Sequence, residues 1–214
     1  MFDHCTACGA RQDEPELDGS GRLVCASCGD RRALRRLPLL LVGGPAGAGK
    51  STAAAALLGV LTEVVVIESD LLWRREFNTP EDGYNSYLRL WLRLAAHISQ
   101  SGRPVALFGA GFAVPHGVEP LPERRLFEAV HYLGLVCDDE TLVARLRARP
   151  AWRHTPGELI DEHVKFNHWL KEQAGATDPP VTLLDTTAAT AGETASLVAA
   201  WLRERAVRRG ADSC

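Results

Sequence analysis

One stretch of eight residues limits what this chain can fold into more than any other feature. Residues 44–51 read Gly-Pro-Ala-Gly-Ala-Gly-Lys-Ser, which fits the pattern G-x-x-x-x-G-K-[S/T] without a mismatch. The apolar residues 37–42 before it predict a buried strand, and the Ala-rich residues 50–61 after it predict a helix. The glycines let the backbone curl until several N–H groups point inward, where they bind phosphate oxygens. We therefore expect a phosphate-binding loop between a buried strand and a helix; a glycine-rich turn that merely joins the two is the alternative.

The residues of this loop have different expected roles. Lys50 is expected to reach the β- and γ-phosphates of ATP, and the hydroxyl of Ser51 is expected to hold Mg²⁺. Thr52 is placed for a contact with the α-phosphate. The residues expected to bind the nucleotide here are Gly44, Gly47, Ala48, Gly49, Lys50, Ser51 and Thr52.

After the loop, short apolar runs alternate with helical patterns. Strands are expected at 64–67, 104–108, 131–137 and 181–184. Helices are expected at 84–100, 139–149, 158–172 and 193–207. This alternation is typical of βαβ units and predicts an α/β domain whose parallel sheet is covered by helices on both faces. We expect this domain to span residues 35–214 and a smaller module to span residues 1–34.

Composition excludes several classes of protein. The chain has 214 residues, a net charge of −3 and 46% hydrophobic residues, as expected for a globular protein of ordinary composition. A protein that binds nucleic acid with its whole surface is usually basic, so that class is disfavoured. The sequence shows no signal peptide, and its most apolar run, 37–42, is too short to cross a bilayer. A cytoplasmic location is therefore expected.

Four of the six cysteines form two close pairs near the N-terminus. Cys5 and Cys8 fit C-x-x-C, as do Cys25 and Cys28, and sixteen residues separate the pairs. This spacing predicts a structural zinc ribbon, in which four thiolates close a tetrahedral site. Two reducible cysteine pairs without metal are the alternative. The Arg-rich residues 31–36 that follow are interpreted as a solvent-exposed linker or short helix.

An acidic motif follows the second predicted strand of the α/β domain. Residues 68–70 read Glu-Ser-Asp, at the edge of the sheet where the phosphate-binding loop also lies. A carboxylate there can orient an acceptor hydroxyl and take its proton, so Asp70 is the candidate base and Glu68 the lesser one. A helix N-cap is the alternative role for Asp70. The third strand ends without an acid, and no Asn-Lys-x-Asp motif is present, so a GTPase switch is not expected.

Residues 145–154 are rich in arginine. Pro150 is expected to end the preceding helix and open a loop, whose arginines can close over the phosphates as a lid. Arg149 and Arg153 are the expected catalytic pair, and Arg145 is expected to contact the nucleotide. An exposed basic helix end is the alternative.

Residues 70–87 are the candidate acceptor-binding segment. Its aromatic side chains, Trp73, Phe77, Tyr84 and Tyr87, are interpreted equally well as surfaces that stack a base or as core. His116, in the loop after the third strand, is a weaker candidate for a substrate contact.

Taken in order, the phosphate-binding loop, the acid after strand two and the arginines resemble the nucleoside and nucleotide kinase-like P-loop group. This group includes shikimate and gluconate kinases and chloramphenicol phosphotransferase-like enzymes, and the resemblance covers roughly residues 37–208. It implies a three-layer α/β/α fold whose five parallel strands lie in the order 2-3-1-4-5. It also implies lid roles for Arg149 and Arg153, and it places Thr186, in the loop after the last strand, near the adenine. Glu-Ser-Asp departs from the Asp-x-Asp of the shikimate kinase branch.

The expected function is an ATP- and Mg²⁺-dependent transfer of a phosphoryl group to a small acceptor, a nucleoside or nucleotide being favoured. A kinase acting on nucleic-acid ends, or a nucleotide-dependent adaptor that binds its partner through the ribbon, is the alternative. The identity of the acceptor, the purpose of the ribbon and the oligomeric state, including a homodimer, are left open.

Overall fold

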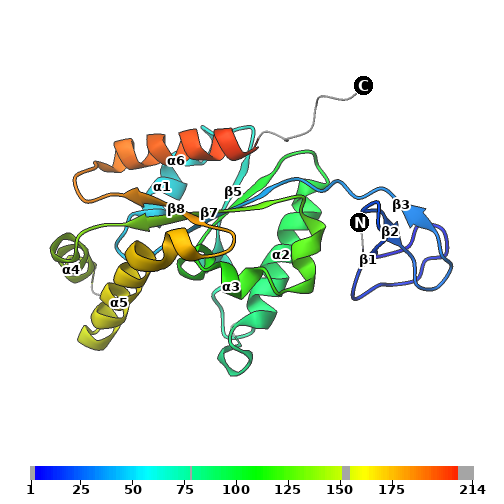
Figure 1. The fold of residues 1–214 in the computed structure, drawn as a ribbon, viewed down its shortest axis with the longest axis horizontal. Coiled ribbons are helices and arrows are strands. Elements are labelled where there is room, and N and C mark those ends of the chain that lie inside the picture. The colour runs from blue at the N-terminus through cyan, green and yellow to red at the C-terminus, as the bar shows by residue number, and fades with distance from the viewer. Residues whose placement is uncertain (1–2, 78, 151–154, 207–214) are drawn as a thin grey trace.

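The α/β domain is built on one parallel sheet. The computed structural model describes residues 3–77, 79–150 and 155–206. Within them, β4 (Leu39–Gly43), β5 (Val65–Glu68), β6 (Val105–Phe108), β7 (Val130–Val136) and β8 (Val181–Asp185) form the sheet (Figure 1). Their order is β5-β6-β4-β7-β8 and all four pairings are parallel. Numbered along the domain this order is 2-3-1-4-5, so the expected topology is confirmed.

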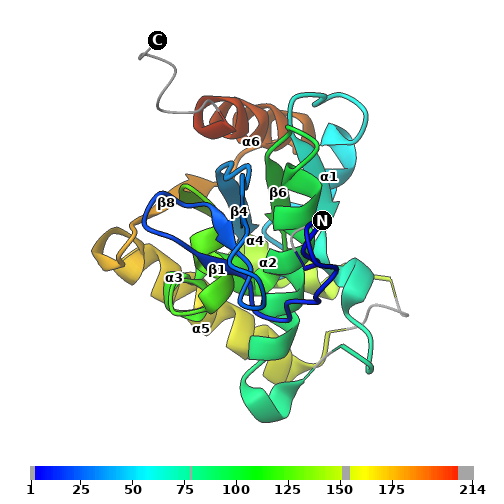
Figure 2. The ribbon, with the colours of Figure 1, turned by 90° about the vertical axis from the view of Figure 1, so that its right-hand side faces the viewer.

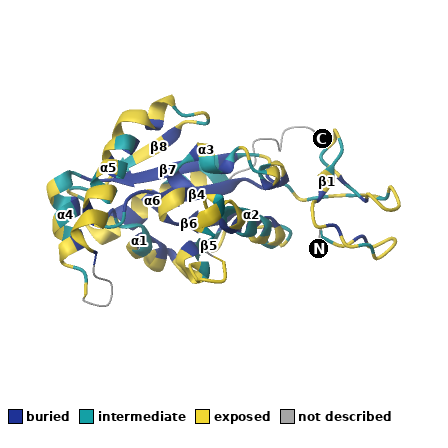
Figure 3. Ribbon diagram, turned by 90° about the horizontal axis from the view of Figure 1, so that it is seen from below, coloured by how far each residue is buried: buried dark blue, intermediate teal, exposed yellow. Residues whose placement is uncertain are grey.

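Helices cover both faces of the sheet, which explains why its central strand is apolar throughout. In β4, Leu40 and Val42 pack with α1 (Lys50–Leu57) and α6 (Ala191–Ala206) in one buried cluster. Leu39 and Leu41 point the other way and pack with α2 (Asn85–Ser99). Because successive side chains of a strand face opposite sides, a central strand with both faces covered must be apolar at every position. Figure 3 shows the resulting buried layer in the middle of the domain.

The remaining elements complete the two helical layers. Three α-helices follow in the second half of the domain: α3 (Pro115–Val118), α4 (Asp139–Arg147) and α5 (Gly157–Gln173). Short 3₁₀ turns are η1 (Ser69–Leu72), η2 (Pro80–Asp82), η3 (Ala110–Ala113), η4 (Pro122–Leu126) and η6 (Ala174–Ala176). The described part of the chain holds no helix that is both long and apolar enough to cross a membrane.

Three short antiparallel strands form a separate sheet near the N-terminus. They are β1 (Glu16–Leu17), β2 (Leu23–Val24) and β3 (Arg31–Arg32), paired in that order. The interpretation of residues 31–36 as a linker or helix is therefore wrong at its start, because Arg31–Arg32 pair with β2. The module lies at one end of the molecule beside α2 (Figures 1 and 2).

This N-terminal module is docked on the α/β domain rather than tethered to it. Leu23 is 3% exposed and belongs to the same buried cluster as the residues of α2. From the α2 side, Arg89 forms an ion pair with Glu14, and Arg93 donates to the Asp13 carbonyl. The module therefore contributes to the hydrophobic core that packs against α2.

Two predicted helices end earlier than expected. The helix after the phosphate-binding loop was expected to reach residue 61 but ends at Leu57, and Gly59 takes the left-handed φ of 76°. The helix expected at 139–149 ends at Arg147. Arg149 therefore follows the helix and does not share one of its faces with Arg145.

Candidate active site

A cavity of about 780 Å³ runs along the carboxyl edge of the sheet, with the phosphate-binding loop at its centre. The β5–β6 side contributes Glu68, Asp70, Trp73, Gly109 and Ala110. The β7–β8 side and the helices contribute Arg145, Arg149, Leu159, His163, Thr186, Ala189, Ala191 and Thr194. The loop itself supplies residues 46–52. Parallel α/β sheets bind ligands at this edge, where the connections leave the strands in opposite directions.

The phosphate-binding loop has the expected curled backbone. Gly47 and Gly49 take φ values of 91° and 98°, a left-handed conformation that strains any residue with a Cβ atom. Lys50 folds back over the loop, with its Nζ donating to the Gly44 carbonyl at 2.8 Å and the Pro45 carbonyl at 2.9 Å. Its ammonium group therefore lies at the mouth of the loop, beside the N-terminus of α1. This arrangement suits an anion that carries several phosphate oxygens.

Both acids after β5 line the cavity, but they occupy different places. Glu68 accepts a hydrogen bond from the hydroxyl of Ser51, the first residue of α1 after Lys50. Asp70 lies one residue into η1 and is exposed to the cavity. It is not an N-cap, since the cap position of η1 is Glu68. The pair thus combines a carboxylate–hydroxyl couple, which suits Mg²⁺, with a second carboxylate next to it.

On the other side of the loop, Arg145 and Thr186 are joined. The guanidinium of Arg145 donates to the hydroxyl of Thr186 at 3.1 Å and to its carbonyl at 2.9 Å. The Thr186 hydroxyl also lies 3.2 Å from the carbonyl of Ala48 in the loop. Thr186 is 1% exposed, so its side chain ties the last strand to the phosphate-binding loop.

Only one of the two expected lid arginines can be placed. Arg149 lines the cavity, and its Nη1 donates to the hydroxyl of Thr155 at 3.3 Å. Arg153 lies outside the described residues. The catalytic pairing of these two arginines therefore stays a prediction.

His163 is a cavity residue that the sequence did not indicate. It lies on α5, and its Nδ1 accepts a hydrogen bond from the N–H of Ala46 at 3.4 Å. Burial and the positive charges of Lys50 and Arg149 lower the pKa of His163 below its usual range. The neutral ring can then accept the loop N–H. A histidine in an ordinary amphipathic helix carries no local signal of this contact.

The aromatic residues of the acceptor segment divide between the two interpretations. Tyr87 is core: it is 5% exposed and its hydroxyl donates to the Ser69 carbonyl at 2.7 Å. Trp73 is 49% exposed and lines the cavity. His116 packs against Trp169 with ring centroids 6.0 Å apart and does not line the cavity.

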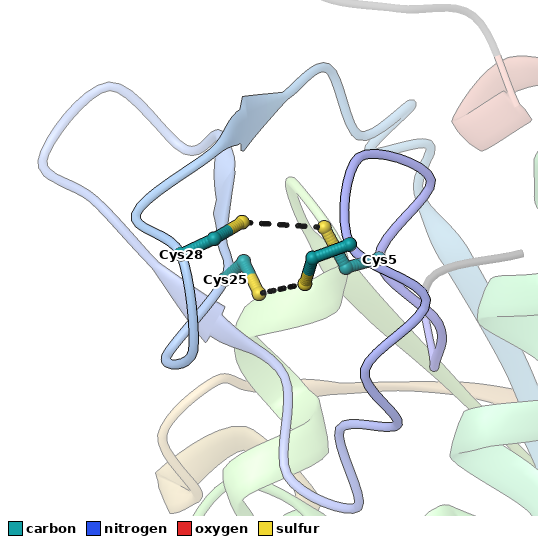
Figure 4. Close-up of side chains that lie close together, drawn as sticks. Cys5, Cys25 and Cys28 are labelled. Atoms are coloured by element: carbon teal, nitrogen blue, oxygen red, sulfur yellow. Dashed lines mark hydrogen bonds between the residues drawn. The ribbon is translucent and has the colours of Figure 1, made fainter.

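The four N-terminal cysteines come together in space. All four sulfur atoms lie within 4.8 Å of one another, and the Cys5–Cys28 and Cys8–Cys25 distances are both 3.7 Å (Figure 4). A tetrahedral zinc site with Zn–S bonds near 2.3 Å separates its sulfur atoms by about 3.8 Å. The donor set and its spacing therefore fit zinc.

The backbone around these cysteines repeats itself in the two halves of the cluster. The N–H of Gly9 donates to the Cys5 carbonyl, and that of Gly29 donates to the Cys25 carbonyl, both at 2.8 Å. Both glycines have a φ of 74°, a conformation that favours glycine. Each C-x-x-C-G segment thus forms the same tight turn, which directs both sulfur atoms to one point.

Comparison with known proteins gives a family and a fold. A family described as an AAA domain matches residues 39–179, from the first residue of β4 to the loop before β8. No curated protein matches the chain.

Several solved structures share the fold. A sugar kinase from Janibacter sp. HTCC2649 aligns with a TM-score of 0.56 and 17% identity, over 81% of this chain and 99% of that chain. A gluconokinase from Sinorhizobium meliloti 1021 aligns with a TM-score of 0.55 and 19% identity, over 80% and 95%. The tunicamycin resistance protein of Deinococcus radiodurans aligns with a TM-score of 0.52 and 17% identity, over 78% and 96%. Identities this low establish a common fold alone.

Proposed function

This chain belongs to the AAA domain family, and from that premise we propose that it is a kinase which transfers the γ-phosphoryl group of ATP to a small acceptor. The observation that carries the proposal is the single cavity in which Lys50, Ser51, Glu68 and Asp70 meet. A phosphate-binding loop alone suits any nucleotide-binding protein. The carboxylates at the end of β5 add a place where a second substrate can be deprotonated. A sugar kinase and a gluconokinase among the structures that share the fold support this choice.

The loop and the helix that follows it are assigned to the nucleotide. The N–H groups of residues 46–52 and the ammonium of Lys50 would hold the phosphates and offset their negative charge as the phosphoryl group moves. Ser51 and Glu68 would hold Mg²⁺, which supplies charge neutralisation and orientation of the phosphates when bound. Arg145 and Thr186 would lie beside the nucleoside part, at the β8 end of the cavity.

Asp70 is assigned to the acceptor. Its carboxylate lies on the β5 side of the loop, opposite the β8 end, so it can accept a proton from an acceptor hydroxyl. Arg149 enters the cavity from the end of α4, where its charge can stabilise the transferred group. The roles of Arg149 and Arg153 as a lid remain part of this proposal.

We further propose that residues 1–34 are a zinc ribbon and that residues 35–214 are the kinase domain. Four thiolates leave no open position on the metal, so the zinc would be structural. The contacts of the ribbon with α2 give it a role in the stability of the kinase domain.

The test is a product assay on zinc-loaded protein with ATP, Mg²⁺ and a panel of acceptors. The panel contains nucleosides, nucleoside monophosphates, neutral and acidic sugars and aminoglycosides. Asp70→Asn is compared with Glu81→Gln, an exposed acid of η2 that does not line the cavity. We expect one acceptor class to be phosphorylated, with turnover reduced at least about 100-fold in Asp70→Asn, unchanged in Glu81→Gln, and ATP affinity retained in both. Full turnover by Asp70→Asn, or no phosphorylated product from any acceptor, would refute the proposal.

A further inference from the structure

The two ends of the cavity differ in charge. The cationic side chains that line it belong to the loop and to the α4 end: Lys50, Arg145 and Arg149. At the β5–β6 end, the charged side chains among the described lining residues are Glu68 and Asp70, both acidic. Arg74 and Arg75 follow Trp73 in sequence, but they are exposed and do not line the cavity. A phosphate or carboxylate group on the acceptor would therefore meet like charge at this end.

The same end presents one aromatic ring. Trp73 remains 49% exposed although two tyrosines hold it in place. Its ring lies 5.5 Å from that of Tyr84 and 5.4 Å from that of Tyr87, which meets it edge-on at 88°. Tyr87 is itself anchored through its hydroxyl and packs against the fully buried Trp91. A ring that is restrained before a ligand binds loses little entropy on binding, which favours stacking.

The turn before α2 appears built around this contact. Tyr84 takes a φ of 66°, a left-handed conformation that is rare for a bulky side chain. Its N–H donates to the Thr79 carbonyl at 3.0 Å, and Asp82 accepts from the Thr79 hydroxyl at 2.8 Å and from the Ser86 N–H at 2.9 Å. These bonds hold the unfavourable conformation, and the result is the packing of Tyr84 on Trp73.

The facing loop after β6 adds little bulk. It contributes Gly109 and Ala110 to the cavity. A Cβ atom at position 109 would lie 2.1 Å from the hydroxyl oxygen of Ser69, so this backbone approaches η1 as closely as glycine allows. This end of the cavity thus combines an acid, a flat aromatic surface and small uncharged residues.

We propose that the acceptor is an uncharged compound that places a planar ring on Trp73 and a hydroxyl group beside Asp70. In chemical terms this is a nucleoside, and not a nucleoside monophosphate, an acidic sugar or a compound without a ring to stack. The inference rests on the proposed function, because that function assigns this end of the cavity to the acceptor.

The transfer then balances as follows. The acceptor oxygen forms a bond to the γ-phosphorus of ATP, while the bond from that phosphorus to the oxygen bridging the β- and γ-phosphates breaks. The hydroxyl proton passes to the carboxylate of Asp70, and ADP is the leaving group.

The test measures binding separately from transfer. Adenosine, guanosine, cytidine and uridine, their 5′-monophosphates, ribose and gluconate are titrated by calorimetry into zinc-loaded protein holding a non-hydrolysable ATP analogue and Mg²⁺. The variants are Trp73→Leu and Trp73→Phe. Phe77→Leu is the matched control, since Phe77 is an exposed aromatic residue of the same segment that does not line the cavity. Thermal unfolding of each variant shows whether it is folded.

We expect at least one nucleoside to bind about tenfold or more tightly than its monophosphate and than ribose, a ratio within the range of base–aromatic stacking. Trp73→Leu is expected to lose about tenfold in affinity, Trp73→Phe to stay within about threefold, and Phe77→Leu to match the wild type. Tighter binding of a monophosphate, no binding of any nucleoside, or no effect of Trp73→Leu would overturn the inference.

Product analysis on the same samples keeps the two proposals apart. A nucleoside that binds through Trp73 but is never phosphorylated would refute the proposed function and leave the binding site standing. Phosphorylation of gluconate or of a monophosphate without nucleoside binding would support a kinase and refute the uncharged acceptor.

Discussion

Replacing Arg89 with methionine is expected to destabilise the folded protein by about 2 kcal/mol. Arg89 lies on α2 between two acids that differ sharply in exposure. Its Nε donates to both carboxylate oxygens of Glu123, at 3.1 and 3.0 Å, and its Nη2 donates to Glu14 of the N-terminal module at 3.0 Å. Glu123 is 2% exposed, whereas the Glu14 side chain is 65% exposed.

The magnitude follows from what each acid loses. Removing one partner of a buried ion pair costs about 3 to 5 kcal/mol, because the remaining charge stays buried. Arg89 is itself 35% exposed and Arg93 stays 3.7 Å from Glu123, so we expect the lower figure of about 2 kcal/mol. The exposed contact with Glu14 is worth about 0.5 kcal/mol or less. Methionine retains the apolar stem of arginine, so the loss reports the charge rather than the packing.

The assay is urea unfolding of zinc-loaded protein followed by circular dichroism and by tryptophan fluorescence. Coincident transitions in the two signals justify a single free energy of unfolding. Arg89→Met is compared with Glu14→Gln, which removes only the exposed pair and is expected to cost about 0.5 kcal/mol at most. In a thermal scan the expected difference between the two variants is about 4 to 6 °C. If Arg89→Met were no less stable than Glu14→Gln, Glu123 would not depend on Arg89, and the reasoning from its burial would be refuted.

Three further outcomes are expected. Lys50→Ala lowers ATP affinity about 100-fold by calorimetry through loss of charge-assisted bonds to phosphate, whereas Lys165→Ala, exposed on α5, leaves it unchanged; equal affinities would contradict the role of Lys50. The lowered pKa of His163 means that the unfolded chain takes up a proton more readily than the folded one, so wild-type stability falls as the pH drops below about 6.5. His163→Gln should show a smaller fall in the urea midpoint over that range, and an identical fall would exclude His163 as a source. Cys8→Ser should lose bound zinc in metal analysis and lower the unfolding temperature, while Cys214→Ser should keep its zinc; retention of zinc by Cys8→Ser would refute the four-cysteine site.

Local sequence determined the fold and the centre of the site. The strand, glycine-rich loop and helix around Lys50 are contiguous, so their geometry depends on residues that are neighbours in the chain. The two C-x-x-C-G segments likewise form their turns locally, and their spacing was enough to predict the cluster. The sheet order followed from the family resemblance, and the strand pairings confirm it.

Tertiary packing decided which side chains of the segments around this centre reach the cavity. Trp73 and Tyr87 were equivalent candidates by residue type, but the packing of α2 buries Tyr87 and leaves Trp73 at the cavity. His163 meets Ala46 across 117 residues of chain, and Arg89 meets Glu14 across 75. Periodicity and short motifs report on neighbours along the chain, whereas these contacts arise only when separate elements pack together. For that reason the phosphate-binding loop could be predicted from the sequence, while the acceptor end of the cavity and the docking of the N-terminal module could not.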